Sequence, residues 1–467
     1  MRKYTFLIFF SSLLLVFSFP NFNFSSSFYA FVGFVPLFFA LQKKSSKESF
    51  WIAYSCGFIF YLGVLYWLYH VTSVGLIILC LYLALYFGIF GFLFNKFAFT
   101  LYPSPFTIFF IPIIWTCLEW LQSHLFTGFG WASLGYTQYK NISLIQIADI
   151  SGVFGVSFVI MLVNIAVYKA FKRSFREIMF AALILLMVFV YGEIKLDKKA
   201  EGDSVKVSVI QGNIPQGLKW DPDETEFIIS RYIDLTRLSA FDKPDLIVWP
   251  ETSFPGFFIS DKDLTDRVIG LAKNVRIPIL LGTNTEKGFE NFNSALLISK
   301  TGELAGQYDK IHLVPFGEYV PFSDKIPILH DLVLGVLGEF TAGKEYSAFS
   351  LEPRAFSGDI KFATLICFED MFPRMSREFV KNGARFLIVI TNDAWYGKSG
   401  AAYQHTAGSV FRAIENRVPI VRCANTGYSC FIDSYGRIVD AVEENSANLF
   451  ITGHKTAIIK LHNFQNK

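Results

Sequence analysis

The feature that most constrains the fold of this chain is a change in composition near residues 196–203, where apolar stretches give way to the charged string LDKKAEGD. Several of the stretches before it are comparable in length to the roughly 20 apolar residues that a helix needs to cross a bilayer. We therefore predict a membrane domain over residues 1–196 with about seven α-helices. The predicted spans are Thr5–Phe19, Phe28–Leu41, Trp51–His70, Ser73–Phe94, Pro105–Leu121, Leu144–Val167 and Ile178–Tyr191.

The composition of the whole chain supports a membrane partner and excludes several other classes. Of 467 residues, 52% are apolar and only 17% are charged, against roughly 25% charged in soluble domains. A net charge of +3 fits neither a disordered tail nor a polybasic nucleic-acid surface. The six cysteines include no C-x-x-C pair, so we predict no bound metal and no cofactor.

Basic residues in the short loops between the predicted spans indicate their orientation. Alternate loops hold ten lysines and arginines, whereas the intervening loops hold only Lys140. Because basic loops stay on the cytoplasmic side, the amino terminus is predicted to be cytoplasmic. An odd number of spans then places the residues after Leu196 on the far side of the membrane, which in a bacterium is the periplasmic or outer face.

Residues 203–455 alternate short β-rich runs with helical stretches, which predicts an α/β domain with its own core. Residues 456–467 are predicted to be a short tail, without an apolar run long enough to span a membrane. The predicted strands are the runs VKVSVIQ from Val205, DLIVW from Asp245, PILLGT from Pro278, SALLIS from Ser294, KFATLIC from Lys361, FLIVIT from Phe386 and PIVRCAN from Pro419. The predicted helices are Glu224–Ala240, Asp261–Asn274, Met375–Asn382 and Tyr403–Asn416.

Polar residues follow the ends of three predicted strands, where α/β proteins place their chemistry. Glu251 follows DLIVWP, Cys367 ends KFATLIC, and Asn392 follows FLIVIT; Lys310 lies in the turn YDKIHLVPFGEYVP. A cysteine nucleophile needs a base to take its proton and a cation to favour its thiolate. Cys367, Glu251 and Lys310 together supply these three roles.

The motifs VWPET, YDKIHLVPFGEYVP and ICFED together resemble the carbon–nitrogen hydrolase (nitrilase) superfamily, whose signature is a Glu-Lys-Cys triad. With the preceding spans, the chain resembles its membrane branch, the apolipoprotein N-acyltransferases. The motifs QGNIPQGLKWDP, NDAWYG and NRVPIVRCANTGYS agree with that branch. The resemblance implies a multi-span α-helical membrane domain followed by an αββα sandwich domain.

The resemblance also implies a ping-pong acyl transfer. Cys367 as nucleophile would take an acyl chain from a phospholipid, and the amine of a diacylglyceryl-cysteine lipoprotein would then accept it. Glu251 would be the general base and Lys310 the oxyanion stabiliser. The expected partners are the bilayer, the phospholipid donor and the lipoprotein acceptor, with the chain itself a monomer.

Four further residues match positions of the family pattern. Glu318 would be a second essential glutamate that orients Lys310, and Trp220 would lie on a loop that closes over the site. Phe368 and Glu369 follow the nucleophile and are expected at the substrate-binding site with Trp220. Phe368 departs from the tyrosine common at this position, which places any hydrogen bond of that hydroxyl in doubt. A further departure is the tail, because the family usually ends with another membrane helix.

Some segments leave alternatives open. The apolar run Ile326–Gly338 is predicted either as a buried helix or as an amphipathic lid that guides acyl chains. Cys423 and Cys430 are expected to pack inward, with a disulfide between them as the alternative.

Two rival functions also remain. A membrane-tethered amidase would use the same triad with water in place of the lipoprotein amine. A receptor or transporter would instead explain the carboxylates Glu119 and Asp149 in or near apolar spans.

Overall fold

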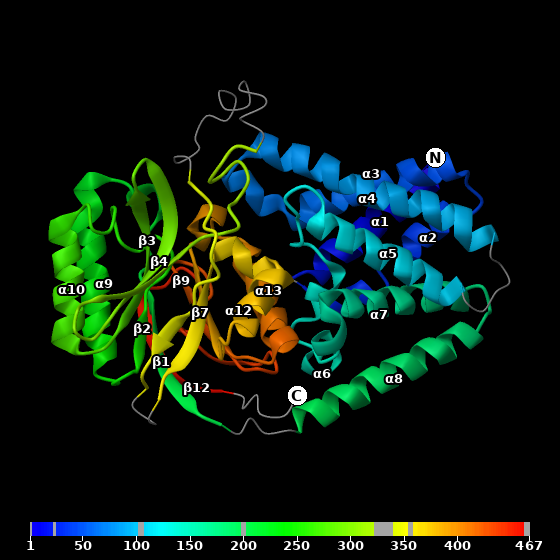
Figure 1. Cartoon of the computed structure of the whole chain (residues 1–467). Coiled ribbons are helices and arrows are strands. Elements are labelled where there is room, and N and C mark those ends of the chain that lie inside the picture. The colour runs from blue at the N-terminus through cyan, green and yellow to red at the C-terminus, as the bar shows by residue number, and fades with distance from the viewer. Residues whose placement is uncertain are drawn as a thin grey trace. The chain divides into compact units, whose positions relative to one another are not determined.

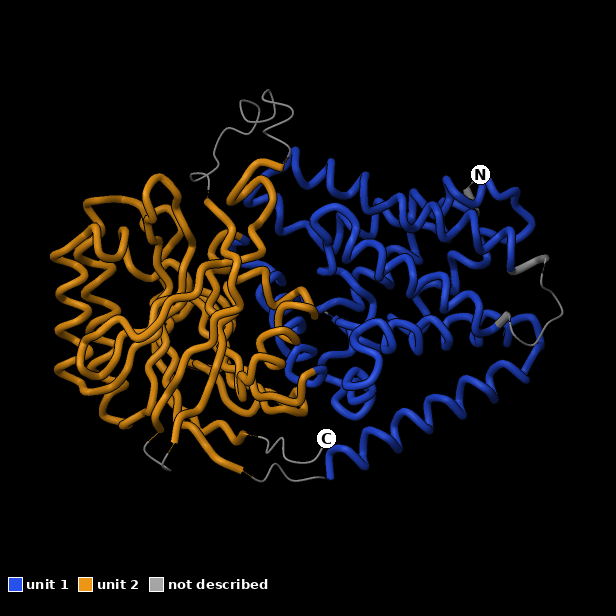
Figure 2. Tube along the Cα trace, viewed as in Figure 1, with its two compact units in different colours: residues 1–199, 396–415 blue, residues 200–395, 416–467 orange. Residues whose placement is uncertain are grey.

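The computed structural model describes residues 2–21, 25–100, 107–197, 202–321, 340–353 and 358–461. The chain divides into two compact units, coloured separately in Figure 2. Unit 1 comprises Met1–Lys199 and Tyr396–Glu415, and unit 2 comprises Ala200–Trp395 and Asn416–Lys467. Unit 1 therefore contains a segment, Tyr396–Glu415, that lies between two parts of unit 2 in the sequence.

Unit 1 is built from helices, as its apolar stretches predict (Figure 1). Three helices among the described residues are long and apolar enough to cross a membrane: Ser73–Phe97, Ala148–Ala170 and Arg176–Leu196. The other helices of unit 1 are shorter or less apolar, so the total of seven crossings stays a prediction. The helices are α1 (Arg2–Ser18), α2 (Val35–Leu41), α3 (Ser46–Val64), α4 (Ser73–Thr100), α5 (Thr107–His124), α6 (Ile142–Ile145), α7 (Ala148–Ala170), α8 (Arg176–Leu196) and α13 (Ala401–Asn416), whose last residue belongs to unit 2.

The two carboxylates that suggested a transporter have local partners in unit 1. Glu119 Oε1 accepts hydrogen bonds from Trp115 Nε1 at 2.9 Å and from Leu134 N at 2.7 Å. Asp149 pairs with Lys195 at 3.1 Å and accepts a hydrogen bond from Tyr191 at 2.7 Å. These contacts hold segments of the unit together, so the two carboxylates need no transport role.

Gln404 of α13 joins several segments of unit 1. Its Oε1 accepts hydrogen bonds from the indole nitrogens of Trp67 at 3.1 Å and Trp131 at 2.9 Å. Its Nε2 donates to the carbonyl oxygens of Pro20 and Val64 at 3.3 and 3.2 Å. Because Gln404 is only 4% exposed, these hydrogen bonds lie in the buried interior, where polar groups need partners.

We expect Gln404→Leu to lower the melting temperature of the detergent-solubilised chain. Leucine cannot hydrogen-bond, and each buried polar group left without a partner costs about 1–3 kcal/mol. Gln42→Leu is the matched control, since the Gln42 side chain is only partly buried. Equal melting temperatures for the two variants would contradict this role of Gln404.

Within its described residues, unit 2 contains two six-stranded sheets whose central strands are parallel. The strand order is β12-β1-β2-β3-β4-β5 in the first sheet and β11-β10-β9-β8-β7-β6 in the second. The first sheet comprises β1 (Ser204–Gln211), β2 (Leu246–Val248), β3 (Ile279–Lys287), β4 (Glu290–Ile298), β5 (Leu304–Asp309) and β12 (Gly453–Lys460). The second comprises β6 (Phe349–Leu351), β7 (Ile360–Ile366), β8 (Phe386–Thr391), β9 (Ile420–Ala424), β10 (Cys430–Ile432) and β11 (Ile438–Ala441).

Helices α9 (Thr225–Ala240) and α10 (Lys262–Val275) cover the outer face of the first sheet (Figure 1). Their apolar faces form a core with that sheet, in which Trp249 stacks on Tyr232. Helix α12 (Pro373–Lys381) packs against β7 of the second sheet. The helix–sheet–sheet–helix order confirms the predicted αββα fold, because strands buried on both faces need a covering layer on each side.

All seven predicted strands are present, and five shorter or more polar strands were not predicted. Among these, β12 pairs antiparallel with β1 from Ser204↔Lys460 to Gln211↔Gly453. Residues 456–460, predicted as part of a tail, therefore belong to the first sheet. The sequence of β12, GHKTAIIK, has only three consecutive apolar residues and is mostly polar or charged before them, so a search for long apolar runs does not find this edge strand.

Two of the open alternatives concern unit 2. Cys423 and Cys430 are both free and buried, which confirms the inward packing and excludes the disulfide. The run Ile326–Gly338 lies outside the described residues, so both interpretations of it stay predictions.

Candidate active site

The residues singled out at strand ends lie together at one rim of unit 2. Glu251 follows β2, Lys310 follows β5 directly, and Cys367 follows β7. Asn392 follows β8, and its backbone N–H donates to Glu251 Oε2 at 2.9 Å. This hydrogen bond joins the first sheet to the second, because β2 and β8 belong to different sheets.

Cys367 begins a short 3-10 helix, Cys367–Met371, immediately after β7. Its φ is +54°, a left-handed conformation that costs a residue other than glycine about 1–3 kcal/mol and is typical of functional sites. Burial and the Glu251 carboxylate raise the pKa of the Cys367 thiol well above its usual value, while Lys310 opposes them. At neutral pH the thiol is therefore protonated and needs a base before it can attack.

Lys310 is a buried ammonium between two carboxylates. Its Nζ lies 2.8 Å from Glu318 Oε1 and 3.5 Å from Glu251 Oε1. The two carboxylates raise the pKa of Lys310 against the effect of burial, so the side chain stays charged. Asn293 Nδ2 donates to Oε1 of both glutamates at 2.9 Å. These four side chains form one hydrogen-bonded group.

The backbone of Glu251 is packed closely against β3. A Cβ atom on Gly282 of β3 would lie 2.6 Å from the Cα of Glu251 and 2.6 Å from the carbonyl oxygen of Pro250. Any larger residue at position 282 would therefore push the Glu251 segment away. The next residue, Thr252, has a φ of +45°, which is rare for a β-branched side chain.

Glu318 and Glu369 both hold backbone segments of the site. Glu318 Oε2 accepts a hydrogen bond from Val314 N at 2.7 Å, which fixes the turn that follows Lys310. Glu369 is fully buried, and its Oε1 accepts from Tyr308, Ile311 N and His312 N at 2.8–3.0 Å. Its Oε2 accepts from Ile366 N at 2.8 Å. Glu369 thus connects the segment after β5 with the segment around Cys367.

The other two predicted substrate-binding residues differ in exposure. Phe368 is 7% exposed, and its ring packs edge-on against Phe372 with centroids 4.9 Å apart. Trp220 is 41% exposed and follows the short helix Gln216–Leu218. Trp220 is therefore accessible to solvent, and its place in substrate binding stays a prediction.

A buried ion group lies behind the site and was not predicted. Arg422 of β9 pairs with Asp370 at 3.0 Å and with Asp393 at 3.2 Å. Asp370 lies in the helix that Cys367 begins, and Asp393 begins the 3-10 helix after β8. Arg422 therefore fixes two of the segments that carry the site residues to one strand.

Asn293 and Lys219 are further site residues that the sequence did not single out. Asn293 lies inside a β-rich run, where an isolated amide gives little signal. Lys219 precedes Trp220 in the motif QGLKWDP, and that position was the only available signal. Its Nζ donates to the carbonyl oxygen of Glu251 at 3.0 Å and to Thr252 Oγ1 at 2.7 Å.

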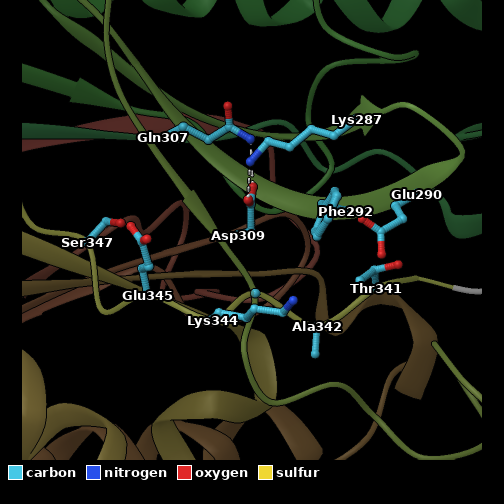
Figure 3. A pocket seen from close by; sticks show the side chains of 11 residues that line it. Lys287, Glu290, Phe292, Gln307, Asp309, Thr341, Ala342, Lys344, Glu345 and Ser347 are labelled. Atoms are coloured by element: carbon cyan, nitrogen blue, oxygen red, sulfur yellow. Dashed lines mark hydrogen bonds and ion pairs between the residues drawn. The ribbon is translucent and has the colours of Figure 1, made fainter.

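A separate hollow of about 290 Å³ lies beside β3, β4 and β5 (Figure 3). Its lining includes Asp309, the residue before Lys310, and the segment Thr341–Gly343. The Asp309 carboxylate accepts hydrogen bonds from Ser294, Gln307 and Lys287 at 2.6–2.7 Å. Gly343 N donates to the carbonyl oxygen of Lys310 at 2.8 Å, so this wall of the hollow also supports the backbone of Lys310.

No group of three or more His, Cys, Asp or Glu side chains arranged to hold a metal ion occurs in the described ranges. The chemistry that the rim itself offers is nucleophilic. It combines a buried thiol, a carboxylate that can take its proton, and a charged ammonium.

Known protein families match both halves of the chain. Residues 11–166 match the "Apolipoprotein N-acyltransferase N-terminal domain" family, and residues 206–456 match the "Carbon-nitrogen hydrolase" family. The chain is 39% identical over 456 residues to the apolipoprotein N-acyltransferase of Geobacter metallireducens, covering 92% of this chain and 85% of that protein. It is 31% identical over 472 residues to apolipoprotein N-acyltransferase 2 of Treponema denticola, with 93% and 88% covered. Among solved structures, an amidase of Nesterenkonia AN1 from the nitrilase superfamily matches with a TM-score of 0.42 at 16% identity, covering 56% of this chain and 92% of that chain.

Proposed function

This chain belongs to the apolipoprotein N-acyltransferase family, and we propose that it moves an acyl chain from a phospholipid to the amino-terminal amine of a diacylglyceryl-cysteine lipoprotein. The observation that carries this proposal is the buried group of Glu251, Lys310 and Glu318 at the rim where Cys367 begins its helix. A protonated thiol beside a carboxylate and a fixed ammonium is suited to acyl transfer through a thioester.

In the first half-reaction, Glu251 takes the proton from the Cys367 thiol and the sulfur attacks the ester carbonyl of the phospholipid. A C–S bond forms, and Lys310 stabilises the negative charge on the carbonyl oxygen. The C–O bond then breaks, and the proton on Glu251 passes to the departing glycerol oxygen. A lysophospholipid leaves, and the acyl chain stays on Cys367.

In the second half-reaction, the neutral amine of the lipoprotein attacks the thioester carbonyl. A C–N bond forms, the C–S bond breaks, and Glu251 takes a proton from the attacking nitrogen and returns it to the sulfur. Glu318 holds Lys310, and Glu369 holds the segments on either side, so we assign both as positioning residues. Trp220 and Phe368 are assigned to the substrate-binding surface.

We further propose that the chain is a multi-pass inner-membrane protein with seven crossings and unit 2 on the periplasmic side. The excess of basic residues in alternate loops supports this topology. Phospholipid, lipoprotein and bilayer are then its partners, and a monomer suffices because every proposed catalytic side chain comes from one chain. The amidase alternative is not favoured, because the matched relatives extend over both halves of the chain and are named as acyltransferases.

The test is intact mass spectrometry of the detergent-solubilised full chain with phospholipid, followed by a diacylglyceryl-cysteine peptide. We expect an acyl-sized mass increase that maps to Cys367 and moves to the peptide amine when the peptide is added. Active, folded protein that never gains this mass would contradict the lipid donor. A gain that water removes at the same rate with or without the peptide would favour a hydrolase.

A further inference from the structure

Thr391 is a buried polar residue of the site that the proposed mechanism does not use. It is the last residue of β8 and is fully buried. β7 and β8 pair in parallel up to Ile366↔Ile390, so Cys367 and Thr391 are the next residues of two neighbouring strands. The backbones of neighbouring strands lie about 4.8 Å apart, which brings Thr391 beside the residue proposed as the nucleophile.

The Thr391 hydroxyl has two hydrogen-bonding neighbours. It donates to Asp393 Oδ1 at 3.1 Å. The Thr391 side chain also forms a hydrogen bond with Cys367, and this contact favours the thiolate form of Cys367 over the thiol. A hydroxyl has only one proton to donate. Thr391 can therefore donate to the Asp393 carboxylate or to a Cys367 thiolate, but not to both at once.

Asp393 is held in place by more than its contact with Thr391. Its Oδ2 lies 3.2 Å from the Arg422 guanidinium, and a Cβ atom on Gly427 would lie only 2.1 Å from the same oxygen. The carboxylate therefore fits closely against the Gly427 backbone and stays paired with Arg422. If Thr391 turns its hydroxyl elsewhere, the charge of Asp393 is still compensated by this buried ion pair.

We propose that Thr391 is a further catalytic residue, whose hydroxyl turns from Asp393 to the Cys367 sulfur when that sulfur becomes a thiolate. The proposal rests on Cys367 being the nucleophile of the proposed function. Glu251 removes the thiol proton, and the Thr391 hydroxyl then donates to the sulfur while keeping its own proton, so no covalent bond of Thr391 changes. The thiolate attacks in the first half-reaction and leaves in the second, so the same hydrogen bond assists both.

This assignment divides the negative charge of the reaction between two groups. Lys310 stabilises the charge on the carbonyl oxygen, and Thr391 stabilises the charge on the sulfur. The sulfur needs such a donor because burial and the Glu251 carboxylate both oppose the thiolate.

The test is the rate at which iodoacetamide alkylates Cys367 at pH 8, mapped by peptide mass in the full detergent-solubilised chain. Iodoacetamide reacts with the thiolate, so the measurement needs no lipid. Thr391→Val replaces the hydroxyl with a methyl group, and we expect it to slow alkylation about tenfold, the effect of one pKa unit. Thr391→Ser keeps the hydroxyl and should react at the rate of the unmodified chain.

Thr364→Val is the matched control. Thr364 of β7 is a fully buried threonine of the same sheet, and its hydroxyl has no hydrogen-bond partner within the part of the chain that the structure describes. Its replacement should leave the alkylation rate unchanged. Thr391→Ala and Thr391→Ser form a second pair that differs only in the hydroxyl. The alanine variant should react about tenfold more slowly than the serine variant, even if Thr391→Val disturbs β8.

Equal alkylation rates for Thr391→Ser and Thr391→Ala would overturn the proposal, as would slowing that Thr391→Ser shares with Thr391→Val. Failure of the acyl-transfer function is a separate result. If the variants alkylate as expected but the unmodified chain never gains an acyl chain, Thr391 still acts on Cys367 and the lipid donor is wrong. If Cys367 carries an acyl chain but all Thr391 variants alkylate at one rate, the proposed function stands and the role of Thr391 is wrong.

Discussion

Replacing Lys310 with methionine should lower the rate of acyl-enzyme formation at least about a hundredfold, the usual loss when one stabilising group of an oxyanion is removed. It should also destabilise unit 2. The ammonium lies 2.8 Å from Glu318 and 3.5 Å from Glu251, and without it two buried carboxylates face each other. Removing one partner of a buried ion pair lowers the free energy of unfolding by about 3–5 kcal/mol.

The destabilisation of Lys310→Met should depend on pH in a known direction. Without the cation, the two buried carboxylates repel each other, and a proton bound by the folded variant relieves this repulsion. The variant is therefore least stable at high pH and recovers stability as the pH falls. Melting temperatures of the solubilised chain at pH 5 and pH 8, compared with the unmodified chain, measure this.

Two further variants make the prediction for Lys310 specific. Lys287→Met removes a nearby lysine that is 55% exposed and pairs with Asp309 (Figure 3). Because solvent screens the exposed ammonium, its loss should cost about 1 kcal/mol. Adding Glu318→Gln to Lys310→Met removes one of the opposed carboxylates and should restore stability without restoring activity. If the double variant regains activity, Lys310 does not stabilise the oxyanion.

Replacing Cys367 with alanine should abolish the acyl-sized mass increase completely while leaving the fold intact. Alanine keeps the Cβ atom and adopts the left-handed backbone at +54° at the same cost as cysteine, so the local strain does not change. The loss of activity would then report on the sulfur alone. Intact mass spectrometry after incubation with phospholipid measures the adduct, and circular dichroism measures the fold.

Cys430→Ala is the matched control for Cys367→Ala. Cys430 is also a free, buried cysteine of unit 2, but it lies in β10, and no described hydrogen bond joins it to Glu251 or Lys310. Its replacement should leave the adduct unchanged. An adduct that persists in Cys367→Ala and disappears in Cys430→Ala would show that Cys430, and not Cys367, is the nucleophile.

The strands and helices of unit 2 that bury apolar side chains could be predicted from local patterns, because burial leaves a periodic signal in the sequence. β12 could not, since it is an edge strand whose apolar run is only three residues long. The sequence also predicted only part of the division into two units, because it did not indicate that Tyr396–Glu415 belongs to unit 1. Gln404 lies in a helix that the sequence predicts, but nothing local indicates that its side chain contacts Trp67 and Trp131, which are hundreds of residues away.

The sequence by itself determined the family, the apolar character of the first half, and the candidate Glu251, Lys310 and Cys367, because these depend on residue types in local motifs. Only the tertiary structure decided which side chains and backbone groups contact these candidate residues. Three contacts join residues far apart in the chain. The backbone N–H of Asn392 donates to Glu251, Asn293 donates to both Glu251 and Glu318, and Lys219 donates to the carbonyl oxygen of Glu251. Burial changes the proton affinity of a side chain and depends on the packing of both sheets, so the charge of Cys367 and Lys310 is a property of the fold and not of their motifs.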